Sequence, residues 1–213
     1  MTSKGSEPVP MILNGEKLEL KGLYINGKAL AEGVDYDLDA KTLVIKSPPV
    51  GDFVLGCITD IEPQNNTSLN GLYKSGGNFC SQCEAEGFRR ISLHPDRPDV
   101  LSRWQVRIEA SRSSCPVLLS NGNAVQEESV GADRHAVTWD DPFPKPSYLF
   151  ALVAGDLREI RDHYTTASGR QVTLRLHVEE GDEPFTAHAM ASLKRSMQWD
   201  ESVYNLEYDH LKF

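Results

Sequence analysis

Short apolar runs separated by glycine, proline and asparagine dominate the first 155 residues. Residues 43–45 and 53–58 are compact apolar runs, and residues 104–110 alternate between apolar and polar with a period of two. Such runs are typical of strands, because successive side chains of a strand point to opposite faces. The proline-rich residues 141–146 interrupt this pattern and predict a rigid loop. The chain should therefore have a mainly β fold with many short strands.

Two dipeptides predict hairpin turns. Asn26-Gly27 follows an apolar stretch and suits the positive φ angles of a tight turn. Ser168-Gly169 separates two stretches, residues 159–165 and 171–178, that both alternate as strands. A helix should follow, capped by Asp182 or Glu183 and with Pro184 in its first turn. Its packed face is predicted from helical spacing to hold Phe185, Ala189, Met190, Leu193 and Met197.

Charge and hydropathy exclude several classes of function. The chain has 213 residues and a formal net charge of -9, which disfavours a nucleic-acid partner. It contains no apolar run of about 18 residues, the length expected of a membrane span, and residues 1–10 lack the apolar core of a secretory signal. We expect a cytoplasmic protein, organellar import being an open alternative, with no membrane partner.

The four cysteines leave two alternatives open. Only Cys80 and Cys83 have the C-x-x-C spacing of metal or redox sites. A zinc site would need Cys57, Cys115 or a histidine to complete four ligands. Reduced, partly buried thiols are the expected state of the cysteines. A thiol redox role for Cys80 and Cys83 is a separate functional hypothesis.

The segment between residues 66 and 99 holds the candidate site. Gln82, Glu84 and Glu86 follow a strand-like run, and read alone they are solvated loop carboxylates and an amide that could bond to backbone groups. A charged cluster follows them. It could order the loop through bidentate pairing, and a surface network is the simpler interpretation; its members are Arg89, Arg90, Asp96, Arg97 and Asp99.

The segment Q-C-E-A-E-G-F at residues 82–88 resembles the N-terminal domain of zinc aminopeptidases of the aminopeptidase N type. The resemblance continues through residues 116–123, 141–156 and 165–170. It implies a twisted, saddle-like N-terminal domain of two sheets. It also implies that the first hairpin and helix of a thermolysin-like α/β catalytic domain come next.

The resemblance and the change of pattern after Asp156 divide the chain into three parts. Residues 1–10 are expected to form a flexible tail. Residues 11–156 are expected to be the N-terminal β domain, truncated at its start. Residues 157–213 are expected to be the truncated beginning of the catalytic domain.

In the resembled family, an acidic residue of the Q-C-E-x-E-G-F segment binds the amino terminus of the peptide. That residue corresponds to Glu84, with Gln82 beside it as a hydrogen-bonding partner, and Glu86 is expected to be structural. A carboxylate makes charge-assisted hydrogen bonds to an α-ammonium, so the substrate partner would be a peptide N-terminus.

The family's catalytic zinc site does not occur in this sequence. None of the six histidines is followed by glutamate, so the H-E-x-x-H helix is missing. Zinc is therefore expected in the parent enzyme and not bound to this chain, which should be inactive alone and need the remainder of the catalytic domain as a partner. The alternative function is a non-catalytic β-sheet module for protein interaction.

Overall fold

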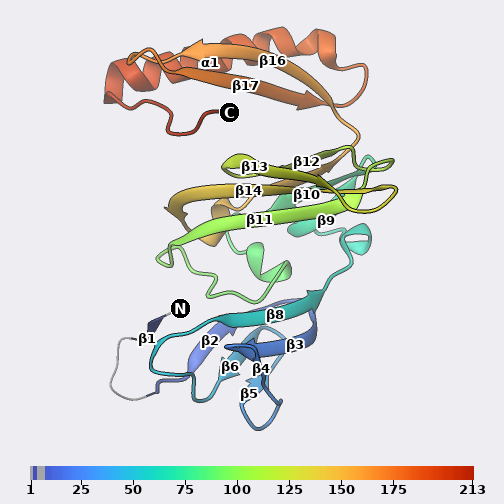
Figure 1. The fold of residues 1–213 in the computed structure, drawn as a ribbon, viewed down its shortest axis with the longest axis vertical. Helices are drawn as coiled ribbons and strands as arrows, with labels where there is room; N and C mark the ends of the chain where they lie inside the picture. Colours follow the sequence, from blue (N-terminus) through green and yellow to red (C-terminus); the bar gives the residue numbers. More distant parts are fainter. Residues whose placement is uncertain (1, 4–7) are drawn as a thin grey trace. The chain divides into compact units, whose positions relative to one another are not determined.

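The computed structural model describes residues 2–3 and 8–213 (Figure 1). The chain divides into two compact units, one of Met1–Trp104 and Phe143–Val153, the other of Gln105–Pro142 and Ala154–Phe213. Strands provide most of the regular structure in both units, which confirms the predicted mainly β class.

Part of the predicted tail, residues 1 and 4–7, lies outside the described residues. Within that tail, β1 (Thr2–Ser3) pairs antiparallel with β7 (Gly51–Asp52).

Two small antiparallel sheets begin the first unit. Asn26 and Gly27 have φ angles of 50° and 79° and connect the first hairpin, which confirms the turn predicted there. One sheet has the order β2 (Met11–Asn14), β6 (Thr42–Ile45), β5 (Tyr36–Leu38), and the other β4 (Lys28–Ala29), β3 (Glu19–Ile25), β8 (Leu55–Asp60).

The inward residues of these two sheets form a shared apolar core. Alternation along the strands brings apolar side chains to one face of each sheet, where burial removes them from water. Leu13 and Leu43 are fully buried at its centre. The buried members are Leu13, Leu23, Ile25, Tyr36, Leu43, Ile45, Phe53 and Leu93.

A further hairpin in the first unit leads to the candidate site. β9 (Gly71–Ser75) and β10 (Asn78–Gln82) pair antiparallel, with Gly76 and Gly77 at positive φ in the turn. The register places Gln82, the last residue of β10, opposite Gly71. The hairpin therefore fixes the start of the segment that carries Glu84.

A three-stranded sheet, most of whose residues belong to the second unit, has the order β11 (Ser102–Ser111), β14 (Arg134–Lys145), β13 (Asn123–Ser129). The predicted proline-rich loop is wrong, because β14 continues through this stretch to Lys145. The pairing of β13 with β14 ends at Asp140, so Pro142 and Pro144 have no β13 partner that would need their missing N–H donors.

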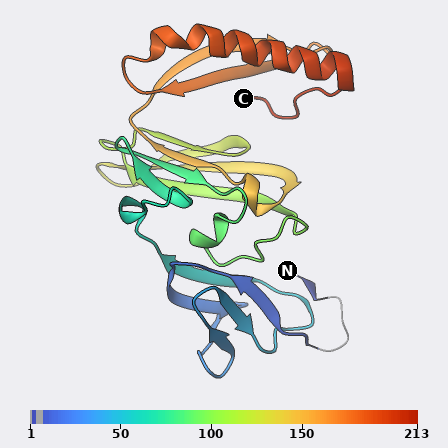
Figure 2. The same ribbon diagram turned by 180° about the vertical axis from the view of Figure 1, so that it is seen from behind.

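A hairpin and a helix complete the second unit, and α1 (Thr186–Tyr204) lies along the hairpin (Figures 1 and 2). β16 (Arg158–Thr165) and β17 (Gln171–Val178) pair over their full length, which confirms the hairpin predicted around Ser168-Gly169. Val172, Leu174, Met190 and Met197 form the buried core between hairpin and helix.

The predicted start of the helix is wrong. A 3-10 turn, η4 (Glu183–Phe185), precedes α1, and neither Asp182 nor Glu183 caps α1. This turn places Phe185 before the helix, where its side chain is 78% exposed. Ala189 lies within α1 but also faces solvent. Met190, Leu193 and Met197 pack as predicted.

The remaining segments are short. Leu211 and Phe213 hydrogen-bond to Thr173, which places the last residues beside β17. The other elements are η1 (Pro63–Asn65), η2 (Phe88–Arg90), β12 (Val117–Ser120), η3 (Ser147–Leu149) and β15 (Leu152–Gly155). Within the described residues, no helix has the length and apolar character needed to cross a membrane.

Candidate functional site

The candidate site is the turn that follows β10, and it lies wholly in the first unit. Gln82 ends the strand, and residues 83–87 turn the chain into η2. Gly87 N–H donates to the Cys83 carbonyl at 2.8 Å and closes the turn. The peptide bond between Glu84 and Ala85 is cis. Cys83 is buried, while Gln82 and Glu84 are exposed on either side of it.

The Glu84 carboxylate is available to a ligand. Within the described part of the chain it has no hydrogen-bond or ion-pair partner, and its side chain is exposed. An exposed carboxylate of this kind can accept charge-assisted hydrogen bonds from an ammonium group. The geometry therefore permits the role that the resemblance implies for Glu84.

Gln82 lies next to Glu84 but is directed in part to the backbone. Its Nε2 donates to the Glu84 carbonyl oxygen at 3.2 Å. This is the backbone role that the sequence left open for the amide, and it links the end of β10 to the turn. Glu86 faces solvent and pairs with Nη1 of Arg89 at 3.2 Å, an ion pair within the turn.

A close approach of backbone segments fixes the end of the turn. A Cβ built on Gly87 would overlap the Gln82 carbonyl oxygen and Oδ1 of Asn70, and would lie 2.8 Å from Cα of Cys83. Only glycine fits between these atoms without displacing them. Gly87 therefore allows the segment to fold back against the strand that precedes it.

The Arg89–Asp96 ion pair directly follows this turn, and it is not the surface network expected from the sequence. Nε of Arg89 lies 2.9 Å from Oδ2 of Asp96, and the two side chains are 12% and 1% exposed. The nearby Arg97–Asp99 pair is exposed, as expected, with side chains 68% and 63% exposed. The cluster therefore contains one buried pair and one surface pair.

Further hydrogen bonds satisfy Asp96 completely. The hydroxyl of Ser147, a buried residue of η3, donates to its Oδ1. The Arg89 backbone N–H donates to Oδ2 at 3.2 Å, and Asn14 Oδ1 accepts from the Asp96 N–H at 3.1 Å. A buried carboxylate needs such partners, because an unpaired charge is costly to remove from water.

An aromatic cluster supports the start of η2. Phe88 makes edge-on contacts with His94, Trp104 and Phe150 at ring-centroid distances of 5.1–5.2 Å. Burial among these rings lowers the pKa of His94, and the charge of Asp96 opposes that shift. His94 is therefore favoured in its neutral form in the folded chain.

Cys83 of the C-x-x-C pair has the properties of a structural thiol. Burial, with a smaller effect from the charge of Asp96, raises the pKa of Cys83 to about 12. A thiol that stays protonated is a poor nucleophile and a poor metal ligand. Across residues 2–3 and 8–213, no group of three or more His, Cys, Asp and Glu side chains could hold a metal ion.

The sequence predicted Gln82 and Glu84 as site residues, but it did not predict the buried contacts next to their turn. Ser147 gave no signal in the sequence, because an isolated serine after a proline-rich stretch resembles any loop residue. Asp96 was visible only as one charge among five. The local sequence around Arg89 likewise does not show which carboxylate pairs with its guanidinium.

Comparison with protein families gives a match over most of this chain. The model of the Peptidase M1 N-terminal domain matches residues 11–149, which include the turn, Asp96 and Ser147. Aminopeptidase N of Caulobacter vibrioides is 53% identical over 205 residues, covering 96% of this chain and 23% of that protein. Aminopeptidase N of Escherichia coli is 48% identical with the same coverage. The chain thus spans about a quarter of the length of these relatives.

Solved structures share the fold. Legionella pneumophila aminopeptidase A, crystallised with aspartic acid, has a TM-score of 0.91 and 37% identity, covering 95% of this chain and 24% of its own. An M1 zinc metallopeptidase from Deinococcus radiodurans has a TM-score of 0.79 over 98% of this chain and 48% of its own. At 17% identity that second likeness concerns the fold alone. With residues 11–149 matched to the family model, the chain belongs to the Peptidase M1 N-terminal domain family.

Proposed function

We propose that this chain is the N-terminal portion of a zinc-dependent aminopeptidase, and that Glu84 anchors the α-amino group of the peptide substrate. The supporting observation is the exposed, unpartnered carboxylate of Glu84 on a turn that lies within the family match. The relatives that align along 96% of the chain are named aminopeptidase N, which favours this function over a non-catalytic interaction module.

The chemistry of a carboxylate suits the selection of peptide ends. A free α-ammonium carries a positive charge and N–H donors, so it forms charge-assisted hydrogen bonds with Glu84. An internal amide or an acylated amino end has no charge and would leave the carboxylate poorly paired. In this proposal Gln82 supports the turn from the strand side through its bond to the Glu84 carbonyl.

The zinc of the proposed parent enzyme does not fit this chain. Within the described residues no cluster of ligands could hold it, so zinc and the groups that activate water would be supplied by another part of the enzyme. We expect that the 213-residue chain binds and positions the amino end of a peptide but does not cleave the peptide. The second part of the proposal is that catalytic sequence begins near Leu157, with the hairpin and α1.

A hybrid enzyme tests this function. The aligned part of this chain replaces the matching 23% of the Caulobacter vibrioides aminopeptidase N. We expect the hybrid to cleave aminoacyl chromogenic substrates and the isolated chain to leave them intact. A hybrid that folds but has no activity, or an isolated chain whose activity persists through stringent purification, would contradict the proposal.

A further inference from the structure

The carboxylate of Asp96 is the most completely bound side chain near the candidate site. Its side chain is 1% exposed, and both oxygens are engaged. Oδ2 accepts from the backbone N–H and from Nε of Arg89, and Oδ1 accepts from the Ser147 hydroxyl. Nη2 of Arg89 also donates to the Asp96 carbonyl at 3.0 Å.

We propose that Asp96 is a positioning residue for Glu84, acting through Arg89 to hold the turn of residues 83–88 in its binding geometry. This inference rests on the proposed function of Glu84. Asp96 itself would touch neither the substrate nor the metal.

The contacts of Arg89 connect Asp96 to the turn. The Arg89 backbone is in η2, directly after the turn, and its N–H is bound to Asp96. Nη1 of the same guanidinium pairs with Glu86, inside the turn. Glu16 N–H donates to the Arg89 carbonyl at 2.9 Å, which ties η2 to the first sheets. Asp96 is therefore bonded to the residue that follows the turn and, through the Arg89 guanidinium, is linked to the Glu86 side chain within it.

The other end of the turn is already fixed by β10, through the pairing of Gln82 with Gly71. The turn between these two anchors, residues 83–87, carries Glu84 near its start. If the Asp96 anchor is lost, the turn keeps its strand anchor but gains freedom at η2. The direction of the Glu84 carboxylate then varies, and small misplacements of a binding group reduce catalytic efficiency strongly.

A double-mutant cycle in the hybrid enzyme separates positioning from a general loss of structure. The four proteins are the hybrid, Asp96→Asn, Glu84→Gln and the double variant, and kcat/KM is measured for an aminoacyl substrate. We expect Asp96→Asn to lower kcat/KM about tenfold when Glu84 is present, mainly through KM. In the Glu84→Gln background the same change should lower kcat/KM less than about twofold.

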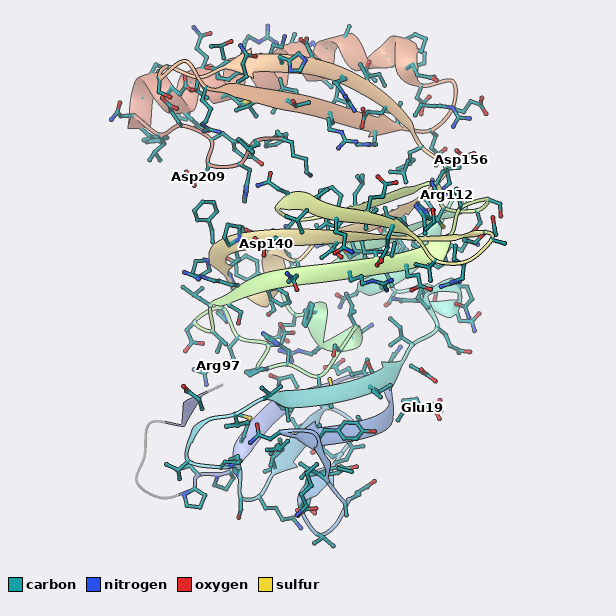
Figure 3. All side chains as sticks on the ribbon, viewed as in Figure 1. Glu19, Arg97, Arg112, Asp140, Asp156 and Asp209 are labelled. Atoms are coloured by element: carbon teal, nitrogen blue, oxygen red, sulfur yellow. The ribbon has the colours of Figure 1, made fainter. Side chains whose placement is uncertain are left out.

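Two matched variants accompany the cycle. Asp99→Asn removes a carboxylate three residues away, in the exposed pair with Arg97, and should change kcat/KM less than about twofold. Of this pair, Arg97 is labelled in Figure 3. Ser147→Ala removes one hydrogen bond of Asp96 and keeps the ion pair, so it carries the same cycle if Asp96→Asn does not fold. Thermal unfolding of every protein is recorded beside its kinetics.

The cycle distinguishes a positioning role of Asp96 from a purely structural one. A loss that is equal in both Glu84 backgrounds would mean that Asp96 only stabilises the fold, and the inference would be wrong. The inference would also be wrong if neither Asp96→Asn nor Ser147→Ala changes kcat/KM. If Glu84→Gln alone has no effect, the proposed function fails, and the positioning role fails with it. A hybrid sensitive to Glu84→Gln but not to the Asp96 and Ser147 variants would retain the proposed function without the positioning role.

Discussion

Gly87 packs directly against the carbonyl group of Gln82, so that a Cβ at this position would overlap the carbonyl oxygen. The contact brings the end of the turn back onto the last residue of β10. The same Cβ would also overlap Oδ1 of Asn70, a buried atom, so neither neighbour has much room to move. The shape of the turn that presents Glu84 therefore depends on the absence of a side chain at Gly87.

Gly87→Ala should destabilise the chain by about 1–3 kcal/mol, the usual cost of forcing an extra group into a packed site. Urea unfolding followed by tryptophan fluorescence measures the change. Gly56→Ala is the matched control, because a Cβ at Gly56 would lie 3.7 Å from its nearest neighbour, an ordinary contact. Equal midpoints for the Gly87→Ala and Gly56→Ala proteins would show that the close approach is not real.

The helix face can be tested with two apolar residues that the sequence placed together. Met197→Ala should cost about 2–5 kcal/mol because Met197 is buried in the core of the second unit. Phe185→Ala should change stability by no more than about 0.5 kcal/mol, since that ring is largely exposed. Denaturant unfolding of both variants gives the comparison, and a larger effect of Phe185→Ala would restore the face predicted from spacing.

Acid should weaken the first unit through His94. Burial lowers the pKa of His94 in the folded chain, so the unfolded chain binds this proton more readily. The stability contributed by neutral His94 is therefore complete above its ordinary pKa of about 6.5 and is lost as the pH falls through the lower folded pKa.

His94→Phe should reduce this loss while keeping an aromatic ring beside Phe88. The free energy of unfolding is measured from about pH 8 down to about pH 5.5, above the range in which most carboxylates titrate. Burial also lowers the pKa of His177, so part of the acid sensitivity remains in the variant. An unchanged slope in His94→Phe would mean that His94 does not contribute.

Local signals in the sequence predicted the parts of the fold that depend on local geometry. Asn26-Gly27 specifies its hairpin because both residues accept positive φ. The alternation of residues 171–178 specifies β17 because one face of that strand is buried. The helix start was missed because Pro184 and its acidic neighbours fit a 3-10 turn as well as a first helical turn.

The candidate site was predictable only in part, for a similar reason. Glu84 and Gln82 belong to one contiguous segment, so a resemblance in sequence could find them together. Ser147 meets Asp96 across 51 residues, and nothing local in the sequence specifies that contact. Burial of the Arg89–Asp96 pair likewise depends on the fold, since charged residues are mostly exposed.

Recognition of a charged amino end by Glu84 can be measured directly in the hybrid enzyme. kcat/KM is measured for a peptide with a free amino terminus in the hybrid, in Glu84→Gln, and in Glu86→Gln as the matched exposed carboxylate of the same turn. We expect Glu84→Gln to lower kcat/KM about a hundredfold, in the range of a lost charge-assisted contact, and Glu86→Gln to lower it less than about threefold. Equal kcat/KM values for the hybrid and the folded Glu84→Gln variant would show that Glu84 does not bind the amino end of the substrate.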